Sequence, residues 1–415
     1  MSLSNNFPTV SPTLNLNFAA AGRLDSRVTF TRSSTATYVN QIGLIQSAAV
    51  NEPRFDYNPS TLAARGLLIE ESRTNLQPYS DDFSNGVWIK DNGISVTSNA
   101  AVSPDGTQNA DLIRGTVSAP NVWVYDDGVS TGVAANTSFT NSVYAKANGV
   151  NFLYIRFEDK ANATNYVYFN LSTGTVSATV GSLSTTATIT PVGNGWYRCT
   201  VTGNSASGSG GNNMLLIGLS DASGSTYLTA SATNGIYIWG AQLEAGSFAT
   251  SYIPTVAASV TRSADVASVN TLSPWYNATE GTIYGEVTGQ IDNRIAWFRD
   301  PAGGNYGDFI AIVNNLSGGG RLAINSGGAT QVQLDTANTI SAGALSKVAG
   351  AYKANDFAVC LNGGAVATDT SGSIPTVTTL LLGHHVDGVY LNGHIRRIAY
   401  YPARLINAQL QALTL

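Results

Sequence analysis

The sequence predicts an all-β protein made of two β-sandwich domains, and three observations support that prediction. Only 11% of the 415 residues are charged, against about 25% in a typical soluble domain, whereas long amphipathic helices need charged outer faces. Glycine contributes 42 residues, and Ser, Thr and Asn fill much of the remainder. Runs rich in Thr, Val, Tyr and Ile, interrupted by Gly and Asn, are typical of short strands joined by tight turns.

Charge, hydropathy and cysteine content exclude several classes of protein. A net charge of −5 with a pI near 5.2 gives no clustered basic surface for phosphate, so no nucleic acid partner is expected. No run approaches the roughly 18 apolar residues of a spanning helix, so no membrane insertion is expected. The start, MSLSNNFPTVSP, lacks the basic and apolar regions of a cleaved export signal. Cys199 and Cys360 fall in different predicted domains, which favours free buried thiols and a reducing compartment.

Residues 1–75 are expected to form a small N-terminal segment ahead of the sandwiches. Around Val28 and Phe30, apolar residues alternate with threonine, which is typical of a half-buried strand. Gly66 precedes a short apolar run that ends at two glutamates, which predicts a turn followed by a buried strand. A segment of this size is too small for a core of its own, so we expect it to dock on its neighbour or on a partner.

Strand patterns recur across residues 76–255 at the spacing of an all-β sandwich. Short apolar and aromatic runs alternate with clusters of Gly, Asn or Ser, and no helical period is present among them. The runs are NVWVYDD, TSFTNSVYAKA, NFLYIRFED, NYVYFNLS, GWYRCTVT, MLLIGLS and NGIYIWGAQLE. Residues 256–272 have little aromatic content, and we interpret them as a linker to the next domain.

A second set of strand patterns, over residues 273–415, predicts a second sandwich. It begins with GTIYGEVTG, RIAWFRD and DFIAIVNN and closes with HIRRIAYY. Asn362 and Gly363 lie between DFAVCL and AVATD, and both tolerate positive φ, which predicts a hairpin. The tail, ARLINAQLQALTL, has helical spacing, with leucines on one face.

Three parts of the sequence resemble known families. LDSRVTFTRSSTATYV, followed by NEPRFDY and GLLIEESRTNL, is similar to a segment near the start of bacteriophage tail, fibre and other virion surface proteins. PVGNGWYRCTV with IYIWGAQLEAGSFATSYIPT resembles the closing strands of the carbohydrate-binding-module-like jelly roll that follows in such proteins. KVAGAYKANDFAVCLNGGAVATD with HIRRIAYYPARLINAQLQAL resembles the concanavalin-like or laminin-G-like sandwich.

The resemblance implies a virion component with two lectin-type sandwiches. Such a protein would be made in the host cytoplasm and exposed on the virion surface. Its expected partners are bacterial surface polysaccharide and, through the N-terminal segment, other virion proteins. By analogy with phage fibres we expect a homo-oligomer, with a trimer favoured.

Strand parity predicts a face rich in tyrosine and arginine within residues 76–255, independently of any family. Side chains two apart in a strand share a face, so the apolar residues of NFLYIRFED and NYVYFNL leave Tyr154, Arg156, Tyr166 and Tyr168 on the opposite face. A short turn between the two runs predicts a hairpin that brings these side chains together. The candidate carbohydrate-binding residues are Trp123, Tyr125, Tyr144, Tyr154, Arg156, Tyr166 and Tyr168.

Aromatic rings beside polar groups match the chemistry of a sugar. A sugar ring has an apolar face of C–H groups and a rim of hydroxyls, and clustered exposed rings favour a partner that covers them. The alternative is that both faces of the hairpin are buried, one in the core and the other beneath the N-terminal segment or another subunit. Parity alone leaves both interpretations open.

Patterns for catalysis and for metal binding are weak. Glycoside hydrolysis needs two opposed carboxyl groups about 5 to 9.5 Å apart, but adjacent acids such as Glu70 and Glu71 point to opposite faces of a strand. Of the three histidines, His384, His385 and His394, the pair His385 and His394 could approach across a hairpin, but without a third ligand from His or Cys beside that pair no zinc site is expected. We therefore expect no enzyme, no catalytic residue and no cofactor. The candidate ligands for a structural calcium ion are Asp105, Asp111 and Glu244.

These observations favour a non-catalytic phage virion protein that binds host cell-surface glycans in adhesion. The alternative is a capsid decoration or fibre-shaft protein whose aromatic face is buried against sister subunits. A polysaccharide depolymerase is the third and weakest hypothesis.

Overall fold

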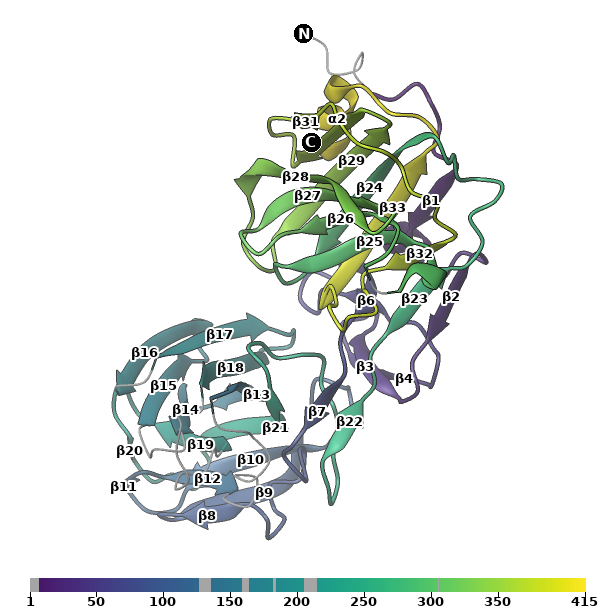
Figure 1. Cartoon of the computed structure of the whole chain (residues 1–415). Helices are drawn as coiled ribbons and strands as arrows, with labels where there is room; N and C mark the ends of the chain where they lie inside the picture. The colour runs from purple at the N-terminus through teal and green to yellow at the C-terminus, as the bar shows by residue number, and fades with distance from the viewer. Residues whose placement is uncertain (1–6, 127–135, 159–163, 182–183, 205–214, 305) are drawn as a thin grey trace.

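The structure, a computed structural model, describes residues 7–126, 136–158, 164–181, 184–204, 215–304 and 306–415. Within these residues the chain folds into two β-sandwiches (Figure 1), which confirms the predicted all-β class. One sandwich is inserted into the other. We call them the terminal sandwich, built from both ends of the chain, and the inserted sandwich, built from the residues between.

The terminal sandwich consists of two large sheets that pack face to face. The first sheet contains, in spatial order, β31 (Ala367–Asp369), β30 (Asp356–Leu361), β29 (Leu345–Lys353), β24 (Glu280–Thr288), β33 (Gly393–Tyr401), β6 (Ala64–Ile69) and β5 (Phe55–Tyr57), with β1 (Leu14–Asn17) also paired to β33. The second contains β2 (Val28–Thr31), β23 (Val266–Val269), β32 (Thr379–Leu382), β25 (Asn293–Arg299), β26 (Phe309–Asn314), β27 (Gly319–Ser326) and β28 (Ala329–Thr339).

The N-terminal residues form part of this sandwich instead of the separate segment predicted over residues 1–75. Strand β1 pairs with β33 from Leu14 opposite Tyr400, and β2 pairs with β23 from Val28 opposite Val269. The physical reason is burial, because Leu14 and its apolar neighbours reach a shared core only by joining the C-terminal strands. The linker predicted over residues 256–272 likewise contains β23 and so contributes to the second sheet.

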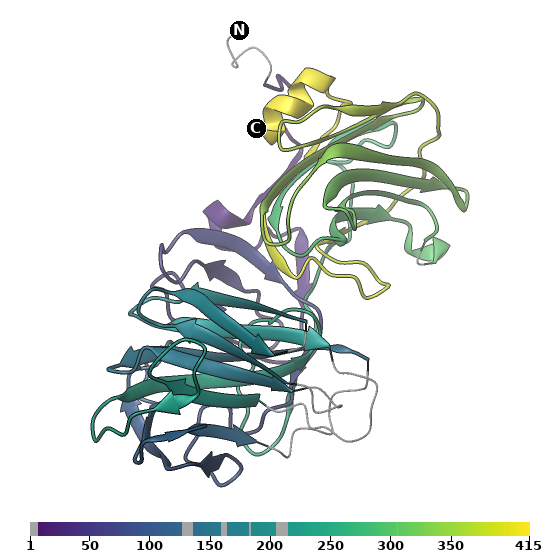
Figure 2. The ribbon, with the colours of Figure 1, turned by 90° about the vertical axis from the view of Figure 1, so that its left-hand side faces the viewer.

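The inserted sandwich occupies most of the predicted range 76–255 and also has two sheets (Figure 2). The first sheet contains β17 (Thr185–Pro191), β18 (Tyr197–Asn204), β13 (Ser138–Asn148), β21 (Gly235–Ala245), β10 (Ala110–Gly115) and β9 (Ile94–Ala101). The second contains β16 (Thr175–Gly181), β15 (Thr164–Asn170), β14 (Phe152–Glu158), β19 (Leu215–Ser220), β12 (Trp123–Asp126) and β8 (Ile89–Asp91). A small pair, β11 (Ala119–Pro120) and β20 (Tyr227–Leu228), lies beside them.

A two-stranded ribbon joins the two sandwiches. Strand β7 (Arg73–Asn75) carries the chain into the inserted sandwich and pairs with β22 (Val260–Arg262), which carries it back (Figure 1). The hairpin of β3 (Ala36–Val39) and β4 (Ile45–Ala48) lies beside this ribbon. Two paired crossings restrict relative motion of the sandwiches more than a single flexible linker would.

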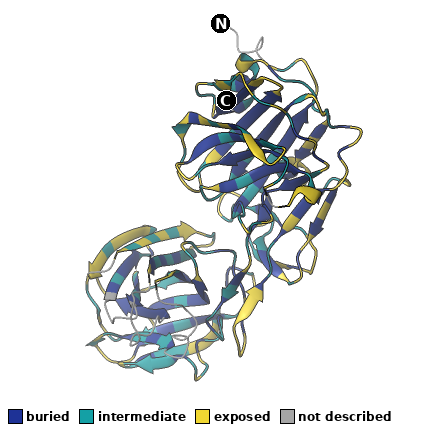
Figure 3. Cartoon of the chain, viewed as in Figure 1, coloured by how far each residue is buried: buried dark blue, intermediate teal, exposed yellow. Residues whose placement is uncertain are grey.

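The alternation predicted for the inserted sandwich is confirmed. Leu153, Ile155 and Phe157 of β14 are all buried in one core, together with Val167 and Phe169 of β15. Strand β14 pairs with β15 in an antiparallel hairpin, as predicted, while the predicted turn over residues 161–165 falls largely outside the described residues. Figure 3 shows this buried interior and the exposed outer edge formed by β16 and β17.

The predicted turn and helix of the C-terminal part are also present. Asn362 and Gly363 have φ of 44° and 67°. Both values lie in the left-handed region, as the predicted hairpin turn requires. Helix α2 (Asn407–Thr414) packs on β29 and β30 through the fully buried Leu410. The other helical elements described are one turn each, α1 (Phe18–Ala21) and the 3₁₀ turn η3 (Pro301–Gly303).

Candidate functional site

Six of the seven predicted carbohydrate-binding residues lie together on the outer face of one sheet of the inserted sandwich. Tyr154 lies opposite Tyr168 and Arg156 opposite Tyr166 in the β14–β15 pair, and β12 follows two strands away, across β19. The ring centroids of Tyr154 lie 5.3 Å from Tyr168 and 5.9 Å from Tyr166. We call this group the tyrosine face, and it comprises Trp123, Tyr125, Tyr154, Arg156, Tyr166 and Tyr168.

The tyrosine face is a packed layer more than an open platform. Tyr154 is 0% exposed and Tyr168 1% exposed, because the rings cover one another and the Tyr154 ring lies over Gly218, which has no side chain. Burial raises the pKa of Tyr168 to about 12. Trp123, Tyr125, Arg156 and Tyr166 are half-buried and provide the surface that remains.

Two donors of the tyrosine face lack hydrogen-bond partners. The hydroxyl of Tyr154 and the indole N–H of Trp123 are buried, and neither contacts an acceptor among the described residues. Arg156 lies 5.9 Å from the Trp123 ring, over its face. A buried donor without an acceptor is destabilising by about 1–3 kcal/mol.

Tyr144 is separated from the other six residues. It lies on β13, in the other sheet, and is 4% exposed. Its ring packs 5.3 Å from Trp239 and 6.1 Å from Tyr252, and the guanidinium of Arg198 lies 5.4 Å from its centroid. Parity predicted that Tyr144 points outward but gave no information on the sheet to which its strand belongs. It therefore lines a second candidate site.

This second site is a cleft between the two sandwiches with a volume of about 420 Å³. Its floor is the outer face of β17, β18 and β13, where cross-strand register aligns hydroxyl groups. Thr188 lies opposite Thr200, and in the next row Thr186 lies opposite Thr202. We call these four threonines the hydroxyl ladder; Ser142, which lies opposite Thr200 on β13, is fully buried.

The opposite wall of the cleft comes from the terminal sandwich. His394 Nε2 lies 2.8 Å from Asp56 Oδ2, and Arg65 Nη1 lies 3.4 Å from the same oxygen. Tyr38 and Phe248, both half-buried, add aromatic surface to the rim. A neighbouring hollow of about 310 Å³ shares Arg65 and His394 with the cleft, so the concave surface continues beyond it.

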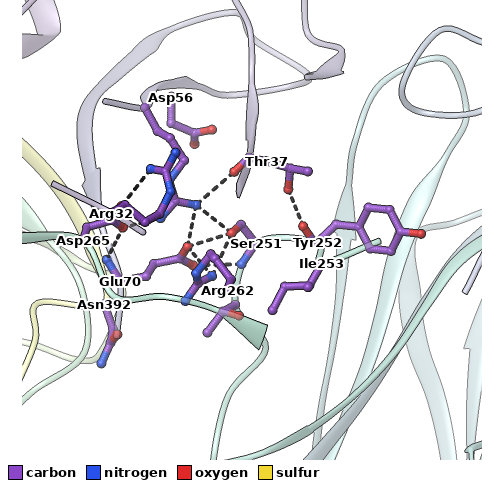
Figure 4. Close-up of polar contacts among 12 residues, drawn as sticks. Arg32, Thr37, Asp56, Glu70, Ser251, Tyr252, Ile253, Arg262, Asp265 and Asn392 are labelled. Atoms are coloured by element: carbon purple, nitrogen blue, oxygen red, sulfur yellow. Dashed lines mark hydrogen bonds and ion pairs between the residues drawn. The ribbon is translucent and has the colours of Figure 1, made fainter. Parts of the chain in front are cut away.

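A buried ionic cluster lies beside the cleft at the point where the chain leaves and re-enters the terminal sandwich (Figure 4). Arg262 Nη1 and Arg54 Nη1 lie 2.7 Å and 2.8 Å from Glu70 Oε2. Arg32 Nη1 lies 3.1 Å from Asp265 Oδ1, and Arg54 also pairs with Asp265. We call Arg32, Arg54, Glu70, Arg262 and Asp265 the junction network.

The junction network also holds the inserted sandwich. Ser251, just beyond β21, donates to Glu70 from its backbone N–H at 2.8 Å and from its hydroxyl at 2.7 Å. Burial alone would raise the pKa of Glu70, but Arg262 and Arg54 hold that pKa well below its usual range. The charged network therefore holds the connection between the sandwiches, the β7–β22 ribbon that we call the neck, and so sets the width of the cleft.

Sequence reasoning did not anticipate the cleft or the network as sites. Arg32, Arg54 and Glu70 lie within motifs that resemble phage proteins, whereas Arg262 and Asp265 lie in the predicted linker. No single run of sequence therefore contains both partners of an ion pair of the network. The hydroxyl ladder is spread over two strands and includes no aromatic residue, so no local pattern distinguishes it from ordinary polar strands. Its register could be found only once the strand order was known.

The predicted calcium ligands do not come together. Asp105 accepts hydrogen bonds within its own turn, Asp111 accepts from two backbone N–H groups, and Glu244 bonds to Thr250. Among the described residues, no group of three or more His, Cys, Asp or Glu side chains could hold a metal ion. Within the same residues, no helix is long and apolar enough to cross a membrane.

Comparisons with known proteins return similar folds. No family model matches the chain, and no curated protein matches it significantly. The CBM40 domain of the Ruminococcus gnavus IT-sialidase bound to alpha2,3 sialyllactose is 18% identical over 34% of this chain and 84% of its own, with a TM-score of 0.30. Domain 4 of AbnA, an extracellular arabinanase from Geobacillus stearothermophilus in complex with arabinotriose, is 15% identical over 37% of this chain and 73% of its own length. Its TM-score is also 0.30.

A third similar structure covers more of the chain. Domains LG4-5 of the mouse laminin alpha1 chain are 10% identical over 69% of this chain and 87% of their own, with a TM-score of 0.23. All three similarities are low in both identity and TM-score. The strand order of the described residues itself defines an all-β protein with two β-sandwiches.

Proposed function

We propose that this protein is a non-catalytic, glycan-binding component of a bacteriophage surface, and that the cleft between its sandwiches binds the sugar. The observation that supports this most directly is the hydroxyl ladder on the floor of a concave site of about 420 Å³. Binding sites for small ligands are typically concave and of about 300–1,000 Å³. The virion assignment rests on the sequence motifs that resemble phage surface proteins.

The chemistry of the cleft matches that of a saccharide. Threonine hydroxyls both donate and accept hydrogen bonds, as sugar hydroxyls do. Thr200 and Thr202 lie half-buried on the floor, and Thr188 is exposed at its edge. Tyr38 and Phe248 offer aromatic surface for the C–H face of a sugar ring.

Attachment would depend on several copies of the protein. Single lectin sites are weak, but linked sites make later binding events effectively intramolecular and raise overall affinity by about 10² to 10⁴. A homo-oligomer, such as the trimer of a fibre, would supply these copies. The terminal sandwich, which includes the N-terminal residues, would contact other virion proteins.

A glycan array of bacterial surface polysaccharides, probed with the full chain, tests the proposal. We expect at least one class of glycan to be bound. The double variant Thr188→Val and Thr200→Val should weaken that binding roughly tenfold, because two hydrogen bonds of about 0.5–1.5 kcal/mol each are lost. Thr368→Val, at an exposed position of β31 outside the cleft, is the matched control. An array with no bound glycan, or equal loss in both variants, would contradict the proposal.

A capsid decoration or fibre-shaft role is the second candidate, and the tyrosine face favours it. The half-buried Trp123, Tyr125 and Tyr166 would pack against a sister subunit. Tyr154 is already buried within one chain, so half-buried Tyr166 is the informative probe. A stable oligomer by native mass measurement, with Tyr166 protected from nitration, would favour this role. A monomer with reactive Tyr166 would exclude it.

A further inference from the structure

The cleft is lined by charged side chains of both signs, but its carboxylates are paired within the protein and, among the described residues, one of its arginines is not. Two arginines, Arg65 and Arg198, line it together with two carboxylates, Asp56 and Glu70. Glu70 is neutralised by the fully buried arginines of the junction network. Asp56 is paired with His394 and Arg65. Neither carboxylate is left to balance the remaining arginine.

Arg198 is that remaining arginine. It lies on β18 opposite Tyr144, at one end of the hydroxyl ladder. No carboxylate lies within ion-pair distance of Arg198 among the residues that the structure describes. Its Nη1 donates to the Thr250 carbonyl at 2.7 Å and its Nη2 to the Ser142 hydroxyl at 3.0 Å.

These contacts fix the guanidinium without neutralising it. The Tyr144 ring supports one side of it, with the guanidinium carbon 5.4 Å from the ring centroid. A guanidinium held in place by neutral acceptors retains its full charge and loses little side-chain entropy when it binds an anion. Its planar fork matches the two oxygens of a carboxylate.

We propose that the ligand of the cleft is an acidic saccharide whose carboxylate pairs with Arg198 while its hydroxyls bond to the hydroxyl ladder. This inference rests on the proposed glycan-binding function and narrows it to one class of sugar. The protein as a whole carries a net charge of −5, so general attraction to polyanions does not explain such binding. The preference for an acidic sugar arises from one cation held in a fixed position, the guanidinium of Arg198.

The test compares each uronic-acid-containing bacterial polysaccharide with its carboxyl-reduced derivative, using the full chain and biolayer interferometry. We expect the native polymer to be bound about tenfold to a hundredfold more tightly than the reduced polymer, as a charged hydrogen bond of about 1.5–3 kcal/mol implies. Arg198→Gln should abolish this difference, and Arg198→Lys should retain part of it. Arg23→Gln, which removes the same charge at an exposed position outside the cleft, should leave it unchanged. Melting curves of each variant identify any loss of fold.

The outcomes separate this inference from the function on which it rests. Equal binding of native and reduced polymers overturns the acidic-sugar inference and leaves glycan binding intact. A preference for the native polymer that persists in folded Arg198→Gln overturns the role of this residue. If no polysaccharide is bound in either form, the proposed function fails and the inference fails with it.

Discussion

Replacing Asp265 by asparagine tests whether the junction network holds the terminal sandwich together. Asp265 is 0% exposed and accepts from Arg32, Arg54 and the backbone N–H of Glu70. Three arginines and two carboxylates give the network a charge of +1, counted as 3 − 2, and the variant raises it to +2 with no change in side-chain volume. The two strands that pass through the neck would then carry unbalanced buried charge.

The expected loss of stability is large. Removing one partner from a buried ion pair typically costs about 3–5 kcal/mol, because the remaining charge is left desolvated. For a domain of this size, each kcal/mol shifts Tm by about 2–4 °C, so Asp265→Asn should lower the Tm of the terminal sandwich by roughly 6 °C or more. Calorimetry and urea unfolding of the full chain measure both quantities.

The matched control is Asp335→Asn, which removes the same charge from an exposed pair with Arg321. The side chains of that pair are 37% and 28% exposed, so we expect a change of less than about 1 kcal/mol. If Asp265→Asn destabilises the protein no more than Asp335→Asn does, the network contributes nothing to the neck and the argument for a fixed cleft is refuted.

Three further predictions follow from burial. Folding lowers the pKa of Glu70, so ionised Glu70 stabilises the protein at pH values above its ordinary pKa of 4.5, and this stabilisation is lost progressively as the pH falls below 4.5. Urea unfolding between pH 7 and 3 should show this loss of stability, and the Glu70→Gln variant should not show it. Gly218→Ala places a methyl group against the Tyr154 ring and should cost about 1–3 kcal/mol, with reduced near-UV dichroism from disturbed tyrosines; an unchanged spectrum and Tm would contradict the packed face. Leu410→Ala in α2 should cost about 2–5 kcal/mol by denaturant unfolding, whereas the exposed Leu316→Ala should be nearly neutral; equal effects would mean that α2 does not pack as described.

The sequence allows the local structure to be predicted because strand alternation is local. Leu153 and Ile155 lie in the core and Tyr154 lies on the opposite face, as their spacing requires. The packing of that face could not be predicted, since it depends on Gly218, a residue of a strand about sixty positions further along the chain. Parity determines the direction of a side chain but not what covers it.

The domain organisation illustrates the same limit at larger scale. Leu14 and Tyr400 are opposite each other in one sheet, yet nothing in either local pattern identifies the other as its partner. Both runs look like ordinary half-buried strands, and pairing between them is decided by the shared core that they complete. The small size of the N-terminal segment predicts that it docks on another core, but it does not identify that core as the one formed by the C-terminal strands.

The insertion explains why the cleft can act as a preformed site. A single linker would leave the sandwiches free to change their separation, and any ligand bridging them would have to offset the entropy lost on ordering them. Here the chain crosses the neck twice, the two crossings pair as β7 and β22, and Glu70 on one side binds Arg262 and Ser251 on the other. The entropy of ordering is thus lost during folding instead of during binding. The proposed sugar contacts on the floor of the cleft would then contribute more of their free energy to affinity, because no further ordering of the two sandwiches opposes binding.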